Sequence, residues 1–106
     1  MNASDRHFAL LEELKSEKND NKKKRICIKD IGLVDKFNKE CIREYGKLPK
    51  SYPSFKTLAI LYEKEGDYKS AIKVCQEAIR AGYPQNGTQG GMEARIKKLH
   101  VKEGKK

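Results

Sequence analysis

The regular recurrence of apolar residues between positions 52 and 85 is the feature that most constrains the fold of this chain. The first set stands three or four positions apart, at Phe55, Leu58, Ala59 and Tyr62. A second set repeats that spacing, at Tyr68, Ala71, Ile72, Cys75, Ala78 and Ile79. Because positions i, i+3, i+4 and i+7 share one face of an α-helix, the pattern predicts two consecutive amphipathic helices.

The residues beside these two sets mark where each helix begins and ends. Pro53 suits a first helical turn, since the N–H that proline lacks would have no partner there. Gly66 ends the first helix, and Asp67 is placed to cap the second. Gly82 and Pro84 end the second helix. We therefore predict an antiparallel helical hairpin joined by a short turn.

Small residues stand on the faces that the two helices turn toward each other. Ala59 lies in the first helix, and Ala71 and Ala78 lie in the second. A larger side chain at any of these positions would push the crossing backbones apart. The alanines predict a close helix crossing, with the larger apolar side chains filling the space around it.

The segment from Tyr52 to Gln85 resembles one tetratricopeptide repeat (TPR), a helix–turn–helix unit of about 34 residues. The resemblance rests on Phe55 at the usual tryptophan position and on the residues that follow it, Leu58, Ala59, Tyr62, Gly66, Tyr68, Ala71, Ala78 and Ile79. Cys75 stands where the family prefers an aromatic residue, and Pro84 falls one residue later than the family's proline. An ordinary αα-hairpin with similar spacing is the alternative.

One such repeat cannot bury both of its faces, and about three are normally needed for stability. Flanking helices, a further part of a longer protein or a second copy of the chain must therefore cover the hairpin. We predict an all-α fold, in which a TPR-like hairpin at residues 52–85 is flanked by additional amphipathic helices. The whole chain, residues 1–106, is expected to form one small domain, and a homo-oligomer is one way to complete it.

The resemblance implies a protein-interaction module or adaptor. In such repeats the first helix lines a groove that receives a peptide or a partner helix. The residues of this chain that would face the groove are Lys56, Ile60, Glu63 and Lys64. Some family members hold a partner's terminal carboxylate with a lysine and an asparagine on successive turns. Lys56 matches that lysine, but Ile60 occupies the asparagine position.

Weaker apolar stripes predict the flanking helices. One lies in residues 4–18, with Ser4 or Asp5 as its cap. A second ends at Gly46, which adopts the left-handed conformation readily, and a third follows residue 91. The apolar residues of these three stripes are, in order, Phe8, Leu11 and Leu14; Val34, Phe37, Cys41 and Tyr45; and Met92, Ile96 and Leu99.

Three segments are predicted to lie outside the helices. Residues 19–25 are expected to form a solvated basic loop, because their four consecutive cations repel one another. Residues 85–91 are rich in glycine and predict a second loop. Residues 100–106 are expected to form a disordered basic tail.

The formal net charge of +9 makes an acidic partner or a nucleic acid electrostatically plausible. Non-specific binding of nucleic acid is therefore the alternative function. Seven residues form what we call the basic patch, namely Lys22, Lys23, Lys24, Arg25, Arg95, Lys97 and Lys98, and Lys102, Lys105 and Lys106 follow them. No recognition-helix signature, Gly-rich RNA motif or set of stacking aromatic residues accompanies these cations. We therefore favour binding of a protein or peptide.

The sequence offers no constellation typical of an enzyme or a metal site. His7 and His100 stand alone, and Cys27 has no neighbouring residue to orient it as a nucleophile. The three cysteines are odd in number, which is unlike a secreted disulfide framework, and they lack paired ligand spacing. No apolar run approaches the roughly 18 residues of a membrane span. We predict no catalytic residue, no metal, no cofactor, no membrane contact and a cytoplasmic location.

Overall fold

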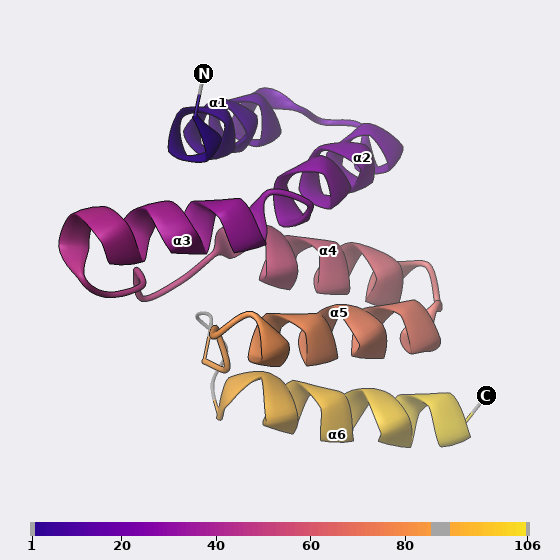
Figure 1. The fold of residues 1–106 in the computed structure, drawn as a ribbon. Coiled ribbons are helices and arrows are strands. Elements are labelled where there is room, and N and C mark those ends of the chain that lie inside the picture. Colours follow the sequence, from indigo (N-terminus) through magenta and orange to yellow (C-terminus); the bar gives the residue numbers. More distant parts are fainter. Residues whose placement is uncertain (1, 86–89, 106) are drawn as a thin grey trace. The chain divides into compact units, whose positions relative to one another are not determined.

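Helices account for the regular secondary structure of residues 2–85 and 90–105, which are the residues that the computed structural model describes. Figure 1 shows them in chain order. Their bounds are α1 (Ala3–Ser16), α2 (Asp20–Ile31), α3 (Val34–Tyr45), α4 (Pro53–Lys64), α5 (Tyr68–Arg80) and α6 (Gly91–Gly104). The described residues contain no strand. The predicted all-α fold is confirmed.

The chain divides into two compact units, Met1–Pro49 and Lys50–Lys106. The division falls in the segment between α3 and α4, which contains Pro49 and is followed by Pro53, the first residue of α4. A helix cannot run through such a segment, because proline lacks the N–H and clashes with the preceding turn. The single domain predicted from the sequence stays a prediction, because this division describes where contacts concentrate and not whether each unit folds alone.

The second unit, residues 50–106, contains the predicted hairpin. Helices α4, α5 and α6 lie side by side and alternate in direction (Figure 1). Pro53 begins α4, and Asp67 caps α5 by accepting a hydrogen bond from the Ser70 N–H at 3.2 Å. Gly66 has φ of +79° in the turn, a conformation that residues with a Cβ rarely adopt. Both predicted helices and their turn are confirmed.

The core of this unit is built on the predicted alanines. Ala59, Ala71 and Ala78 are all buried, so α4 and α5 approach closely where they cross. At one end of the hairpin, the Tyr52 ring lies 5.4 Å from Phe55 and 5.5 Å from Tyr83 between centroids. These aromatic contacts close the space that the small residues leave at the ends of the helices.

Helix α6 covers the other side of α5. Met92 and Leu99 are buried on the face that the sequence predicted, and Ile96 is half-buried between them. The Met92 N–H donates a hydrogen bond to the Pro84 carbonyl at 2.6 Å, which fixes the start of α6 near the end of the hairpin. Of the predicted loop at residues 85–91, residues 86–89 lie outside the described part of the chain, and Gly91 already belongs to α6.

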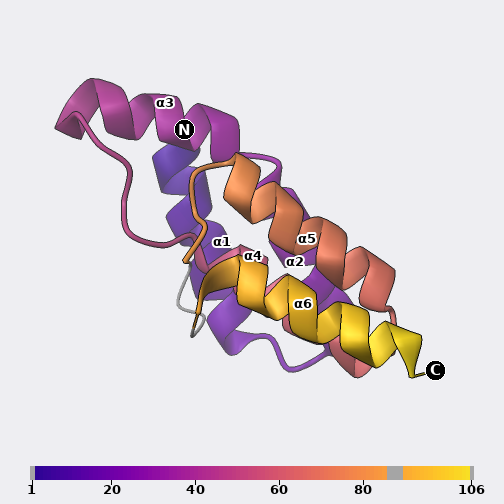
Figure 2. The ribbon, with the colours of Figure 1, turned by 90° about the horizontal axis from the view of Figure 1, so that it is seen from below.

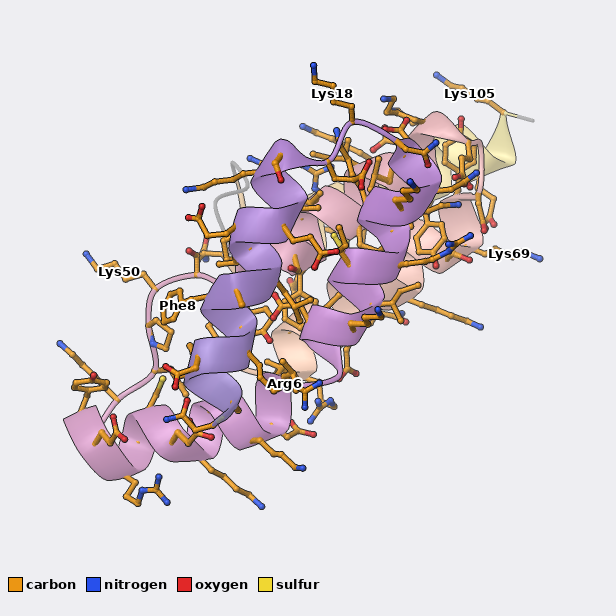
Figure 3. All side chains as sticks on the ribbon, turned by 90° about the horizontal axis from the view of Figure 1, so that it is seen from above. Arg6, Phe8, Lys18, Lys50, Lys69 and Lys105 are labelled. Atoms are coloured by element: carbon orange, nitrogen blue, oxygen red, sulfur yellow. The ribbon has the colours of Figure 1, made fainter. Side chains whose placement is uncertain are left out.

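The first unit, residues 1–49, is organised around α1, which packs against both α2 and α3. His7 and Asp30 are buried and join α1 to α2, with Nδ1 and Oδ1 2.6 Å apart. The His7 ring also contacts Phe37 of α3 at a centroid distance of 4.5 Å. Phe8, which the sequence placed on the buried stripe, is instead 59% exposed (Figure 3). The buried face of α1 therefore differs from the predicted one. It contains His7, which pairs with Asp30, in place of Phe8.

The first turn of α1 is held by side chains that the sequence did not assign to it. Asn2 caps the helix by accepting from the Asp5 N–H at 2.8 Å. Glu40 of α3 accepts from the N–H groups of Ala3 and Ser4, at 2.9 and 3.1 Å. The predicted caps, Ser4 and Asp5, are therefore wrong. Both lie inside the helix, because its cap, Asn2, precedes Ser4 by two residues and Asp5 by three.

Glu40 predicts a loss of stability at acid pH. Hydrogen bonds from the backbone of Ala3 and then of Ser4 hold the pKa of Glu40 below its ordinary value of 4.5. A carboxyl group whose pKa is lowered by folding stabilises the fold above its unfolded pKa, and this contribution is lost as the pH falls through the folded pKa. Glu40→Gln should therefore be less stable than the wild type at neutral pH, and the difference should shrink in acid.

The measurement is the urea midpoint of both proteins from neutral pH to well below pH 4.5. Glu44→Gln is the matched control, since Glu44 is exposed on the same helix. If Glu40→Gln and Glu44→Gln follow the same pH profile, the hydrogen bonds from α1 do not stabilise the ionised Glu40.

Two predicted non-helical segments are helical. Residues 20–25 form the first two turns of α2, whose cap Asn19 accepts from the Lys22 N–H at 3.0 Å. The predicted basic loop at residues 19–25 is therefore wrong. Helix α6 extends to Gly104, so the disordered tail predicted for residues 100–106 is wrong over residues 100–104. Lysine and arginine are good helix formers, so their charge alone does not end a helix that is anchored elsewhere.

Helix α3 follows its prediction closely. Val34, Phe37 and Cys41 are buried, and Gly46 ends the helix with φ of +75°. Tyr45, the last residue of the predicted stripe, is 72% exposed. The apolar stripe of α3 is therefore exposed in the last turn of the helix.

Candidate functional site

An open hollow of about 600 Å³ lies on the surface of the second unit. All three helices of the unit contribute to it, through Ile60, Glu63 and Lys64 of α4, Tyr68 of α5, Lys102 of α6, and Lys105, which follows α6. We call these six residues the α4–α6 hollow. Its volume lies within the range of pockets that bind small ligands, and it can hold a few side chains of a peptide.

Helical spacing explains why three residues of α4 face the hollow. Ile60, Glu63 and Lys64 are three and four positions apart and therefore share one face of the helix. Their neighbours Ala59 and Leu61 are buried in the core. Ile60 is 37% exposed, so the hollow offers an apolar side chain to whatever enters it.

Glu63 is the electrostatic centre of the hollow. One of its carboxylate oxygens lies 3.6 Å from Nη1 of Arg95, and the other accepts a hydrogen bond from the Lys102 ammonium group. Both cations belong to α6, so Glu63 ties α4 to α6. The Arg95 Nε is buried and has no hydrogen-bond partner. A single carboxylate thus stands between two cations.

The rest of the lining combines basic and apolar side chains. Lys64 and Lys105 are exposed, and Lys105 reaches outward from the ribbon (Figure 3). Tyr68 is half-buried at the start of α5 and adds a ring to the lining. The lining therefore combines apolar side chains with more positive than negative charge.

Three of the four residues predicted to face a groove line this hollow. They are Ile60, Glu63 and Lys64, whereas Lys56 lies half-buried on α4 and does not belong to the lining. Sequence reasoning did not assign Tyr68, Lys102 or Lys105 to the groove. The signal that could have placed the two lysines there was the stripe of α6, which predicts a third helix beside the hairpin.

The seven residues of the basic patch are divided between the two units. Lys22, Lys23, Lys24 and Arg25 belong to α2 in the first unit, and Arg95, Lys97 and Lys98 belong to α6 in the second. Successive residues of an α-helix point about 100° apart, so the four cations of α2 are spread around its axis. Lys23 lies 4.0 Å from Asp20, and Arg95 pairs with Glu63.

A second hollow, of about 420 Å³, lies in the first unit between α1 and α3. Its apolar lining includes Phe8, Phe37 and Tyr45, and both signs of charge stand at its rim, with Glu44 near Lys47. The mixed charges do not select a partner of either sign.

The cysteines are internal residues. Cys27, Cys41 and Cys75 are all buried and form no disulfide. Burial raises the pKa of the Cys41 thiol, and it raises the pKa of Cys75 to about 11. Within residues 2–85 and 90–105, no cluster of three or more His, Cys, Asp or Glu side chains could hold a metal ion. None of the helices described combines the length and apolar character needed to cross a membrane.

Comparisons of the chain with protein-family models, with curated proteins and with solved structures give no match.

Proposed function

We propose that the chain is a protein-interaction module that binds a peptide or a partner helix in the α4–α6 hollow. The observation that carries the proposal is the hollow itself. Its exposed Ile60 and half-buried Tyr68 offer apolar contact, and charged side chains surround them. A pocket that combines apolar side chains with a few convergent polar groups is the usual form of a binding site.

The position of α6 supports the same proposal. In stacked helix–turn–helix repeats, each repeat packs against its neighbours and the stack presents an extended binding surface. Helix α6 packs along α5, as the first helix of a following repeat would, and Glu63 ties it to α4. In Figure 2, α4 and α6 overlap along the line of sight while α5 lies to one side. This arrangement fits the resemblance of residues 52–85 to a tetratricopeptide repeat.

Peptide selection tests the proposal. We expect the intact protein to recover binders from a random peptide library, and Ile60→Asp to weaken their binding by at least about tenfold, as loss of a central apolar contact does. Fluorescence anisotropy with each recovered peptide measures the dissociation constant.

The matched control is Val101→Asp. Val101 is a 56% exposed residue of α6 outside the hollow, so this variant carries the same kind of change elsewhere on the unit. Binders that Val101→Asp weakens as much as Ile60→Asp, or the recovery of no binder at all, would rule out the hollow as the binding site. Far-UV circular dichroism verifies that both variants keep their helicity.

A further inference from the structure

The charges of the α4–α6 hollow favour some peptides over others as binding partners. Three lysines and one carboxylate line it. That carboxylate, Glu63, already has two cations beside it, Arg95 and Lys102. The hollow therefore presents an excess of positive charge to an incoming segment, which favours a negatively charged partner.

The apolar side chains of the lining restrict the chemistry of the partner further. Ile60 and Tyr68 stand among the lysines, so an occupant gains most when it carries an aliphatic or aromatic side chain next to its negative charges. A nucleic-acid strand is the other polyanion to consider. Its phosphates repeat along an extended track, whereas the lysines here line a single hollow together with a carboxylate. These features favour a peptide.

We propose that the partner of the α4–α6 hollow is an acidic peptide segment. Its apolar side chain would rest on Ile60 and Tyr68, and its carboxylates would face Lys64, Lys102 and Lys105. This inference rests on the proposed function and specifies the partner of the same site.

Glu63 acts in this arrangement as an internal competitor. Its carboxylate occupies the position between Arg95 and Lys102 that a carboxylate of the partner would favour, because the two groups have the same chemistry. An acidic partner must share these cations with Glu63 or displace it. Removal of the negative charge of Glu63 should therefore strengthen binding, although this residue lies inside the site.

The experiment uses the peptides recovered in the library selection, each compared with a neutral version in which Gln replaces Glu and Asn replaces Asp. The recovered peptides should be rich in acidic and large apolar residues. The acidic version should bind more tightly than the neutral one, and added salt should reduce the difference by screening the charges. A labelled single-stranded oligonucleotide serves as the polyanion that lacks apolar side chains.

Substitutions in the hollow should change the affinity in opposite directions. Lys102→Gln and Lys105→Gln should each weaken binding of the acidic peptide about two- to fivefold, the effect of one exposed charge pair. Glu63→Gln should strengthen it by a similar factor. Lys98→Gln and Glu93→Gln make the same charge changes on exposed positions of α6 outside the hollow and should leave the affinity nearly unchanged. Lys105→Gln remains decisive if Lys102→Gln loosens α6, because Lys105 follows the helix and the ion pairs of Glu63 involve Arg95 and Lys102 instead.

The two proposals can fail separately, and each failure gives a different experimental result. If the binders depend on Ile60 but their neutral versions bind as well, the partner is not acidic and the proposed function survives. If no binder depends on Ile60, both proposals fail. If the oligonucleotide binds more tightly than every peptide and loses affinity in Lys102→Gln and Lys105→Gln, the hollow binds nucleic acid instead.

Discussion

Replacing His7 by leucine is expected to lower the free energy of unfolding by about 2–4 kcal/mol, because the substitution removes a hydrogen-bond partner from a buried carboxyl group. His7 and Asp30 lie 2.6 Å apart, and both are almost completely buried. Leucine fills much of the space of the imidazole ring, so the loss reports the polar contact rather than a cavity. Urea unfolding followed by far-UV circular dichroism measures the effect.

A double-mutant cycle separates this contact from general damage to the core. The double variant His7→Leu/Asp30→Leu should lose less stability than the sum of the two single variants, because it leaves neither group buried without the other. Arg6→Leu, at an exposed neighbouring position on α1 (Figure 3), should change the stability by no more than about 0.5 kcal/mol. Additive single variants would show that the two side chains do not stabilise each other.

The second large effect is expected at Ala71, where leucine should lower the free energy of unfolding by about 1–3 kcal/mol. Ala71 is completely buried in the crossing of α4 and α5. Three additional carbon atoms would force the two helices apart or drive side chains out of their preferred rotamers.

Tyrosine fluorescence suits this measurement, because four of the five tyrosines lie in the second unit, at Tyr52, Tyr62, Tyr68 and Tyr83. Gln76→Leu introduces the same side chain on the exposed face of α5 and serves as the control. An unchanged urea midpoint for Ala71→Leu would mean that the helix crossing has room for a larger residue, contrary to the packing described above.

The sequence predicted the hairpin well because local and long-range requirements coincide there. Pro53, Gly66 and Asp67 mark the ends of the helices by backbone chemistry alone. The apolar stripe between them is also the buried face. Where both signals agree, the sequence determines the element and its orientation.

The first unit was predicted less well because its orientation depends on contacts between distant residues. The turn of α1 toward the core is set by the pairing of His7 with Asp30, which are separated by 23 positions. Apolar periodicity favoured Phe8 for that face. The start of α2 was missed for a different reason. The four cations suggested a loop, but the Asn19 cap and the buried Ile26 and Cys27 hold the helix together.

The sequence predicted half of the residues that line the candidate site. Ile60, Glu63 and Lys64 follow from the helical face of α4. Lys102 and Lys105 line the hollow only because α6 packs along α5. The sequence predicted α6 but not which of its residues lie beside which residues of α5. The contact of Glu63 with Arg95 and Lys102 joins residues more than 30 positions apart and has no local signal.

The burial of all three thiols makes the native protein a convenient carrier for chemical labels. Alkylating reagents and disulfide exchange require an accessible thiolate, and burial both shields Cys27, Cys41 and Cys75 and raises the pKa of Cys75 to about 11. A cysteine introduced at an exposed position such as Lys98 should therefore react faster than any of the three natural thiols. A dye or spin label could be attached there without first removing the natural cysteines.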